Sequence, residues 1–235
     1  MPTGGDWTPL KTEATRFVKK GGTPKTLVHR YLNSVANSGG FGGGGGGGTG
    51  GGTHQAASRV AQNIGNFFAR VGTVGLAGAL QEIGLGHLIG KSAMEIAAAL
   101  LEEWAGPANT LDDAAARAAC DDLQQELLRD VKPDEVESVY VNAVNAQGLD
   151  GIVSQFLGFY IYQRFVRDFY EIWQQKVGQS QAANCLKDVK SYIREALHRD
   201  MTTGLVTAQN WNPNTRNQIT QTILTEVCLV FGVTL

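Results

Sequence analysis

Apolar residues recur at intervals of three and four along most of the chain, which is the spacing of amphipathic helices. Within residues 53–69, one helical face collects Ala57, Val60, Ala61, Ile64 and Phe68. The same spacing predicts further helices over residues 93–104, 111–130, 133–146, 149–177, 182–199 and 214–231. No segment sustains an alternation of apolar and polar residues with a period of two, so the sequence predicts an all-α protein without a sheet.

Local signals indicate where several of these helices begin and how they pack. Ser92 with Glu95 and Thr110 with Asp113 have the spacing of capping boxes at helix starts. Residues 149–177 are rich in aromatic residues and apolar around the helix, so we expect them at the centre of the core. The glycines of residues 71–90 follow a helical pattern rather than a strand. We therefore interpret them as sites of close helix packing or short turns, not as a phosphate-binding loop.

The N-terminal residues have a pattern of their own. Thr8-Pro9 and Thr23-Pro24 each place a cap residue before a proline, which predicts two short helices. This hairpin is too small to fold securely alone, so we expect it to dock on the rest of the chain or on another protein. It is followed by residues 39–52, of which twelve of fourteen are glycine. Ordering so much glycine is entropically unfavourable, and the sequence therefore predicts a flexible tether.

The predicted organisation is thus an N-terminal helical arm over residues 1–38, a disordered glycine-rich linker over 39–52, and an irregular multi-helix body over 53–235. Charge divides along the chain in a similar way. Residues 1–70 contain eight basic and two acidic residues, whereas the whole chain has a net charge of −2, so residues 71–235 carry about −8. The arm is basic and the body is acidic.

The basic residues of the arm are a candidate partner surface. Five of them lie within fifteen residues, and aromatic residues are interleaved with them: Arg16, Lys19, Lys20, Lys25 and Arg30. Such a pattern can contact phosphates while an aromatic ring stacks on a base, so a nucleic-acid-binding module is one interpretation. The modest number of basic residues and a sequence pI of about 6.1 favour docking on the body or on a protein partner instead.

No arrangement of residues in the sequence indicates catalysis, a metal ion or a cofactor. No two of the four histidines are spaced as metal ligands, and the acidic pairs lack an accompanying Glu-x-x-His element. The cysteines Cys120, Cys185 and Cys228 lie in apolar helical patterns, as reduced core thiols do. The sequence shows neither a signal peptide nor an apolar run long enough to span a membrane, so we expect a soluble cytoplasmic protein.

Several short segments together resemble the QatB family, a component of the prokaryotic Qat anti-phage defence operon. They are ATRFVKKGG at residues 14–22, the second helix leading into the glycine tract, LGHLIGKSAME at 85–95 and TLDDA at 110–114. The resemblance extends over about residues 8–130. It implies a non-enzymatic protein whose partners are an ATPase, a TatD-like nuclease and an enzyme similar to 7-cyano-7-deazaguanine synthase, called QueC-like below.

Proteins of this kind are acted on by the QueC-like enzyme near an N-terminal glycine. The resemblance therefore implies N-terminal modification or recognition at Gly4, Gly5, Asp6 and Trp7. The chain departs from this pattern because removal of Met1 exposes Pro2, and Gly4 or Gly5 becomes terminal only after further cleavage. The resulting hypothesis is a substrate or adaptor protein with a flexible N-terminus.

Overall fold

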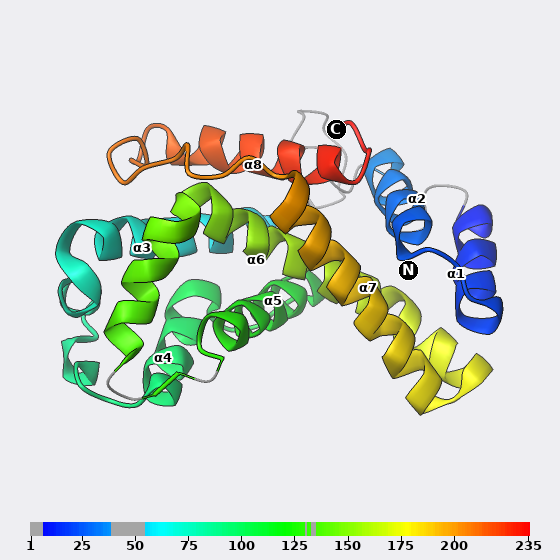
Figure 1. Ribbon diagram of the computed structural model, residues 1–235, viewed down its shortest axis with the longest axis horizontal. Helices are drawn as coiled ribbons and strands as arrows, with labels where there is room; N and C mark the ends of the chain where they lie inside the picture. The colour runs from blue at the N-terminus through cyan, green and yellow to red at the C-terminus, as the bar shows by residue number, and fades with distance from the viewer. Residues whose placement is uncertain (1–6, 39–54, 130, 133–134) are drawn as a thin grey trace.

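The structure is a computed structural model that describes residues 7–38, 55–129, 131–132 and 135–235. The described residues form α helices and one short 3₁₀ helix, η1, and contain no strand, which confirms the predicted all-α class (Figure 1). The helices are α1 (Thr8–Lys20), α2 (Pro24–Asn37), α3 (Gln55–Glu82), η1 (Gly86–Leu88), α4 (Ala93–Ala105), α5 (Leu111–Leu127), α6 (Val136–Val177), α7 (Gln179–Asp200) and α8 (Arg216–Val230). Gly4, Gly5, Asp6 and the predicted linker over residues 39–52 lie outside the described residues.

Helix α6 lies at the centre of the fold and packs against α3, α5, α7 and α8 (Figure 1). Its buried aromatic residues include Phe156, Phe165 and Trp173, as the aromatic pattern predicted. The predicted break at Gly148 is a kink within α6, where this glycine has φ +68°. Two features require glycine at position 148. The positive φ is unfavourable for other residues, and a Cβ there would lie only 2.7 Å from the Cα of Gly204.

The first helix of the predicted body extends further than its sequence pattern indicates. Helix α3 continues past residue 69 to Glu82, with a kink at Gly75, where φ is +74°. Glycine lowers the helix propensity of this part, but Leu76 and Leu80 are buried there. Tertiary packing therefore outweighs local propensity, and the glycine-rich segment turns only after residue 82.

Both predicted capping boxes are formed. The backbone N–H of Glu95 donates to Ser92 Oγ at 3.3 Å, and that of Asp113 donates to Thr110 Oγ1 at 3.0 Å. In each pair the carboxylate accepts a hydrogen bond from the backbone N–H of the cap residue in return. These caps fix the starts of α4 and α5.

The N-terminal hairpin packs on the rest of the molecule through apolar side chains. Helices α1 and α2 contact α6 and α7 (Figure 1, right). The ring of Phe17 stacks on Trp173 with centroids 5.8 Å apart, and Tyr31 meets Phe165 edge-on at 5.2 Å. The sequence left open whether the hairpin docks on the rest of the chain or on another protein. In the structure it docks on the body. Its buried residues belong to the same hydrophobic core as those of α3 to α8.

Candidate functional sites: the N-terminal hairpin and the α3–α8 groove

Trp7, the first described residue, is held against the hairpin. It is half-buried, and its ring lies 6.4 Å from that of Tyr31 in an edge-on arrangement. The Tyr31 hydroxyl donates a hydrogen bond to Asp168 Oδ2 on α6 at 2.9 Å. Of the four predicted N-terminal recognition residues, Trp7 is thus anchored to the body through Tyr31, and the other three precede the described chain.

A second group of polar side chains lies further along α6, and the charge of Arg164 couples it to this anchor through Tyr31 and Asp168. The guanidinium of Arg164 lies 5.9 Å from the ring of Tyr160, whose hydroxyl donates to Asp112 Oδ1. The other carboxylate oxygen of Asp112 accepts from the backbone N–H of Ala56 at 3.3 Å. Burial alone would lower the pKa of Arg164, but the neighbouring tyrosines, Asp112 and Asp168 raise it, so the guanidinium stays charged. Together these side chains connect the hairpin with α6, α5 and the first turn of α3.

The five basic residues predicted as a partner surface are all exposed, but they divide into two groups. Arg16 and Arg30, from the two helices of the hairpin, both approach the buried carboxylate of Glu13, at 2.7 and 3.7 Å. The Arg16–Glu13 pair lies within α1, whereas Arg30, on α2, approaches the same carboxylate across the two helices of the hairpin.

The three lysines of the set form no ion pair with a described carboxylate. Lys19 and Lys20 lie in the last turn of α1, and Lys25 lies in the first turn of α2, so all three are near the turn of the hairpin. Trp7 is at the other end of α1, about 18 Å away for a helix rising about 1.5 Å per residue. Trp7 and the three lysines are therefore at opposite ends of α1.

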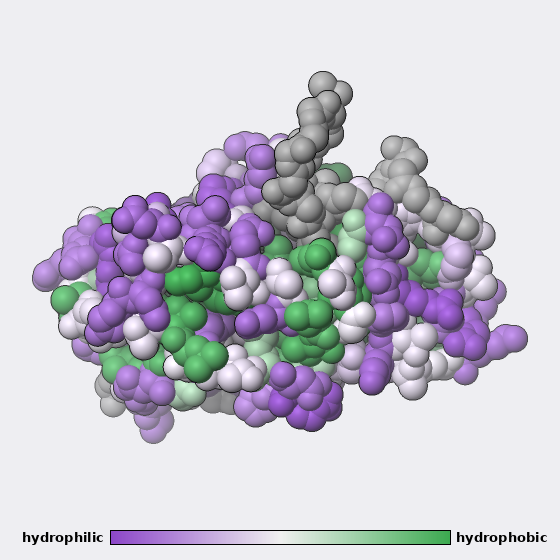
Figure 2. Space-filling view, turned by 90° about the horizontal axis from the view of Figure 1, so that it is seen from above, coloured by the Kyte–Doolittle hydropathy of each residue, from purple (hydrophilic) through white to green (hydrophobic). Residues whose placement is uncertain are grey.

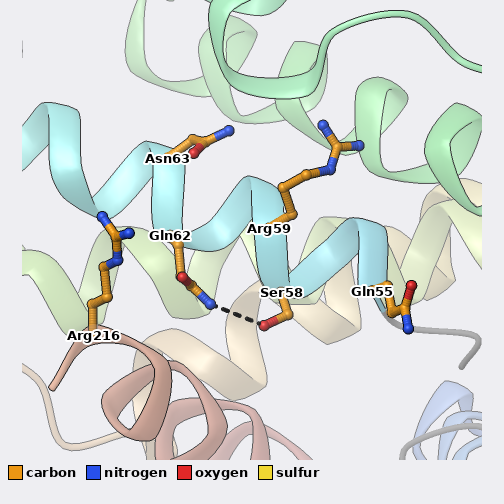
Figure 3. Close-up of a pocket in the computed structure, with 6 residues that line it drawn as sticks. All are labelled: Gln55, Ser58, Arg59, Gln62, Asn63 and Arg216. Atoms are coloured by element: carbon orange, nitrogen blue, oxygen red, sulfur yellow. Dashed lines mark hydrogen bonds between the residues drawn. The ribbon is translucent and has the colours of Figure 1, made fainter. Parts of the chain in front are cut away.

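The second candidate site is a groove between α3 and the start of α8, which we call the α3–α8 groove (Figure 3). It consists of two adjoining cavities that share Arg216 in their walls. One cavity has a volume of about 390 Å³ and is lined by Gln55, Ser58, Arg59, Gln62, Asn63 and Arg216. The other has a volume of about 280 Å³ and is lined by Asn66, Ala69, Arg70, Thr73, Ala208, Trp211, Asn212, Pro213 and Arg216.

The side chains around Arg216 are tightly fixed. Asn66 Oδ1 accepts hydrogen bonds from both Trp211 Nε1, at 3.0 Å, and Arg216 Nη1, at 3.3 Å. The Trp211 ring lies so close to α3 that a Cβ on Gly65 would be 2.0 Å from Cζ2. Glycine at position 65 therefore allows the tryptophan to seat, and the tryptophan positions the amide that contacts Arg216.

Sequence reasoning missed this groove because its two walls are far apart in the chain. A signal was present in the composition of each wall: residues 55–81 and residues 201–225 contain no Asp or Glu, although the chain as a whole is acidic. Seen from the side of α8, the surface over the segment that leads into α8 is mainly hydrophilic (Figure 2, left). The exposed amides there come from Gln209, Asn210, Asn214, Asn217 and Gln218.

The thiols are not arranged for nucleophilic chemistry. Burial raises the pKa of Cys120 and of Cys228 to about 12 in each case, and burial with Asp188 nearby also raises the pKa of the half-buried Cys185. Within the described part of the chain, no three His, Cys, Asp or Glu side chains are grouped so as to hold a metal ion. None of the described helices has the length and apolar character needed to cross a membrane.

Comparison with known families identifies a match over most of the chain. The model of the family described as QatB, Qat anti-phage system associated protein QatB, matches residues 45–231. The matched range includes the segments at 85–95 and 110–114 that carry the sequence resemblance, and it extends beyond residue 130. It leaves out the hairpin and the segment at 14–22. No curated protein and no solved structure shows significant similarity to the chain.

Proposed function

Because the chain belongs to the QatB family, and so is a component of the Qat anti-phage defence system, we propose that it acts there as a non-catalytic substrate or adaptor of a QueC-like enzyme. The segment offered to that enzyme is the N-terminus, with recognition at Gly4, Gly5, Asp6 and Trp7. The other proposed partners are the ATPase and the TatD-like nuclease of the same operon, in the cytoplasm.

The observation that carries this proposal is the anchoring of Trp7. Its contact with Tyr31, and the hydrogen bond of Tyr31 to Asp168, fix the point from which residues 1–6 begin. An enzyme that modifies a chain terminus must receive that terminus in its own active site, and a fixed starting point restricts where the terminus can go. The family match begins at residue 45, so the argument for the terminus rests on the hairpin rather than on the match.

The experiment is an intact-mass measurement of the protein co-expressed with the QueC-like enzyme of its operon. We expect an increase in mass that tandem mass spectrometry places within the first seven residues. A matched variant lacking residues 2–6 should show no increase, whereas the triple variant Lys19→Ala, Lys20→Ala, Lys25→Ala should still acquire it. An unchanged mass in the wild-type protein, with the enzyme present and folded, would contradict the proposal.

A second function is favoured by the three lysines at the turn of the hairpin, which form no ion pair among the described residues, although Lys25 lies near enough to Asp200 to help lower the pKa of that carboxyl. They support the alternative of a nucleic-acid-associated module, because phosphate contacts are made by such unpaired cations. Binding of a labelled oligonucleotide at low and at moderate salt tests this alternative. We expect affinity to fall steeply with salt and to be lost in the triple lysine variant. If the triple lysine variant binds the oligonucleotide as tightly as the wild type does, these lysines are not the nucleic-acid-binding surface.

A further inference from the structure

We propose that the α3–α8 groove is a binding site for the phosphate group of a nucleotide, either free or within a strand. The inference is independent of the proposed role of the N-terminus, because it uses only residues of α3, α8 and the segment between α7 and α8. It starts from Arg216, which lies at the junction of the two cavities.

The guanidinium of Arg216 has unused binding capacity. An arginine side chain carries five N–H donors, and the hydrogen bond found for Arg216 within the described chain is the one from Nη1 to Asn66. It forms no ion pair with a described carboxylate. Since the side chain is half-buried, its charge is only partly solvated. A planar, half-buried guanidinium with unused N–H donors can bind two oxygens of a phosphate group at once.

Arg216 is also held in position before any ligand binds. Asn66 accepts from Arg216 while it accepts from Trp211, and Trp211 is locked against Gly65. In Figure 3 the Arg216 side chain rises from the start of α8 toward α3. The hydrogen bond to Asn66 thus restrains the guanidinium before a ligand binds, which reduces the entropy lost on binding.

The surroundings of Arg216 favour an anion. Arg59 lines the first cavity and Arg70 the second, and their acidic partners, Asp113 and Glu82, do not line the groove. The guanidinium of Arg59 also donates to the carbonyl oxygen of Ala105 and points away from Arg216 (Figure 3), so Arg59 adds charge near the groove rather than a contact in it. The absence of acidic residues from both walls removes the usual source of repulsion. Helix α8 begins at this point with no acidic residue in its first turn, so its positive end adds to the same potential.

The shape and polarity of the groove favour a nucleotide over an acidic peptide. Several lining residues are amides, namely Gln55, Gln62, Asn63, Asn66 and Asn212. Gln62 and Asn63 already donate to Ser58 Oγ and to the carbonyl oxygen of Trp104, so the oxygens of these two amides are the groups left for a ligand. An amide side chain offers a donor and an acceptor together, which is the pattern presented by the edges of nucleobases. The first cavity, at about 390 Å³, is an open polar groove that would leave part of a bound ligand in contact with solvent. The phosphate is assigned to Arg216, and the base to the amide-lined walls.

The test uses the full-length protein and two labelled probes, a nucleoside triphosphate and a short single-stranded oligonucleotide, with inorganic phosphate as competitor. We expect saturable binding of at least one probe, with Arg216→Gln reducing the affinity at least tenfold. Preference for the triphosphate would identify a free nucleotide as the source of the phosphate, and preference for the oligonucleotide would identify a strand. Arg129→Gln, at an exposed position just after the end of α5, serves as the control and should bind as the wild type does.

A second variant separates loss of charge from loss of structure. In Asn66→Asp the side-chain oxygen can still accept the hydrogen bonds of Trp211 and Arg216. The new carboxylate, however, forms an ion pair with the Arg216 guanidinium and competes with a phosphate for it. We expect the fold to be retained, as shown by an unchanged or higher melting temperature, while affinity falls at least tenfold. The proposal is overturned if neither probe binds the wild type, if both variants bind as well as wild type, or if a polyglutamate peptide binds as tightly as the phosphate probes.

Discussion

Single side chains decide how the hairpin and the groove are held. Glu13 is the only acidic residue in residues 7–81, and its carboxylate is buried where the two hairpin helices meet. Gly65 and Trp211 have a similar role in the groove, since one residue provides the space that the other fills. In both cases a feature that looks unremarkable in the sequence, an isolated acid or a helical glycine, has a definite partner far along the chain.

Replacing Glu13 should loosen the hairpin. Glu13→Gln removes the negative charge that Arg16 and Arg30 approach, and because both arginines are exposed we expect a loss of about 1 kcal/mol in the free energy of unfolding. Urea denaturation measures this loss, and hydrogen exchange should place it in α1 and α2. Glu171→Gln, at an exposed position of α6, is the matched control and should leave the stability unchanged.

Adding one methyl group at Gly65 should be strongly destabilising. In Gly65→Ala the new Cβ would lie 2.0 Å from Trp211 Cζ2, so the tryptophan must move away from α3. Overpacking of this kind costs about 1–3 kcal/mol, and the melting temperature should fall accordingly. The control is Gly72→Ala on the same helix, where the nearest atom is a Val144 methyl group at 3.2 Å and a much smaller change is expected. Equal melting temperatures for the two variants would contradict the close packing of Trp211.

The three thiols should differ in reactivity. With pKa values raised to about 12 by burial, Cys120 and Cys228 are protonated and inaccessible at pH 8 in the folded protein. We expect one thiol, Cys185, to react with Ellman's reagent under native conditions and the other two to react only after denaturation. Cys185→Ser should abolish the native reaction. Fast modification of two or more thiols in the folded protein would be inconsistent with the structure.

At the scale of helices, the sequence predicts most of the fold. Capping boxes locate the starts of α4 and α5, and Gly148 marks the kink in α6, because these signals act through neighbouring residues. The extent of α3 beyond residue 69 could not be predicted in the same way, since it depends on burial of Leu76 and Leu80 against other elements. The groove could not be predicted either, because Asn66 and Arg216 meet only in the folded chain.

The cap of α5 provides a test of these local signals. The pKa of Asp113 is lowered, first by the Thr110 side chain and then by its backbone N–H and Arg59, despite an opposing effect of desolvation. A carboxyl with a lowered folded-state pKa stabilises the protein above its unfolded pKa and loses this contribution as pH falls through the folded value. Thr110→Ala should therefore reduce stability by about 1 kcal/mol at pH 7. In urea denaturation the difference from wild type should shrink below about pH 4; a constant difference would argue against the Asp113 contribution.

At the scale of the whole molecule, residues 8–37 and residues 55–235 share one core. The sequence separates an arm from a body by composition and charge, but the contacts of Phe17 with Trp173 and of Tyr31 with Phe165 join them. The predicted role of residues 39–52 as a flexible linker remains a prediction. If these contacts are sufficient to hold the hairpin on the body, residues 39–52 serve only to keep the two parts of the chain near each other. The docked arrangement itself does not then depend on them.

Two separately expressed pieces should therefore associate. We expect residues 1–38, fused to a carrier, to bind residues 53–235 when the two are co-expressed, and Tyr31→Ala in the shorter piece to weaken the complex at least tenfold because it removes a buried aromatic side chain. Co-purification at increasing salt measures this. Lys11→Ala is the control, since its side chain is exposed. In the intact chain, shortening residues 42–52 should leave the melting temperature unchanged, since the contacts of the hairpin with α6 and α7 hold it on the body.

The contact between Trp7 and Tyr31 also couples binding of a partner at the N-terminus to docking of the hairpin on the body. A partner that draws Trp7 away must first break an aromatic contact worth about 0.5–1.5 kcal/mol, so its apparent affinity is lowered about two- to tenfold. Linkage is reciprocal, and occupancy of the terminus by that partner therefore weakens hairpin docking by the same factor. A substitution that loosens this contact would make the protein less stable on its own and a better ligand for the enzyme that binds its terminus.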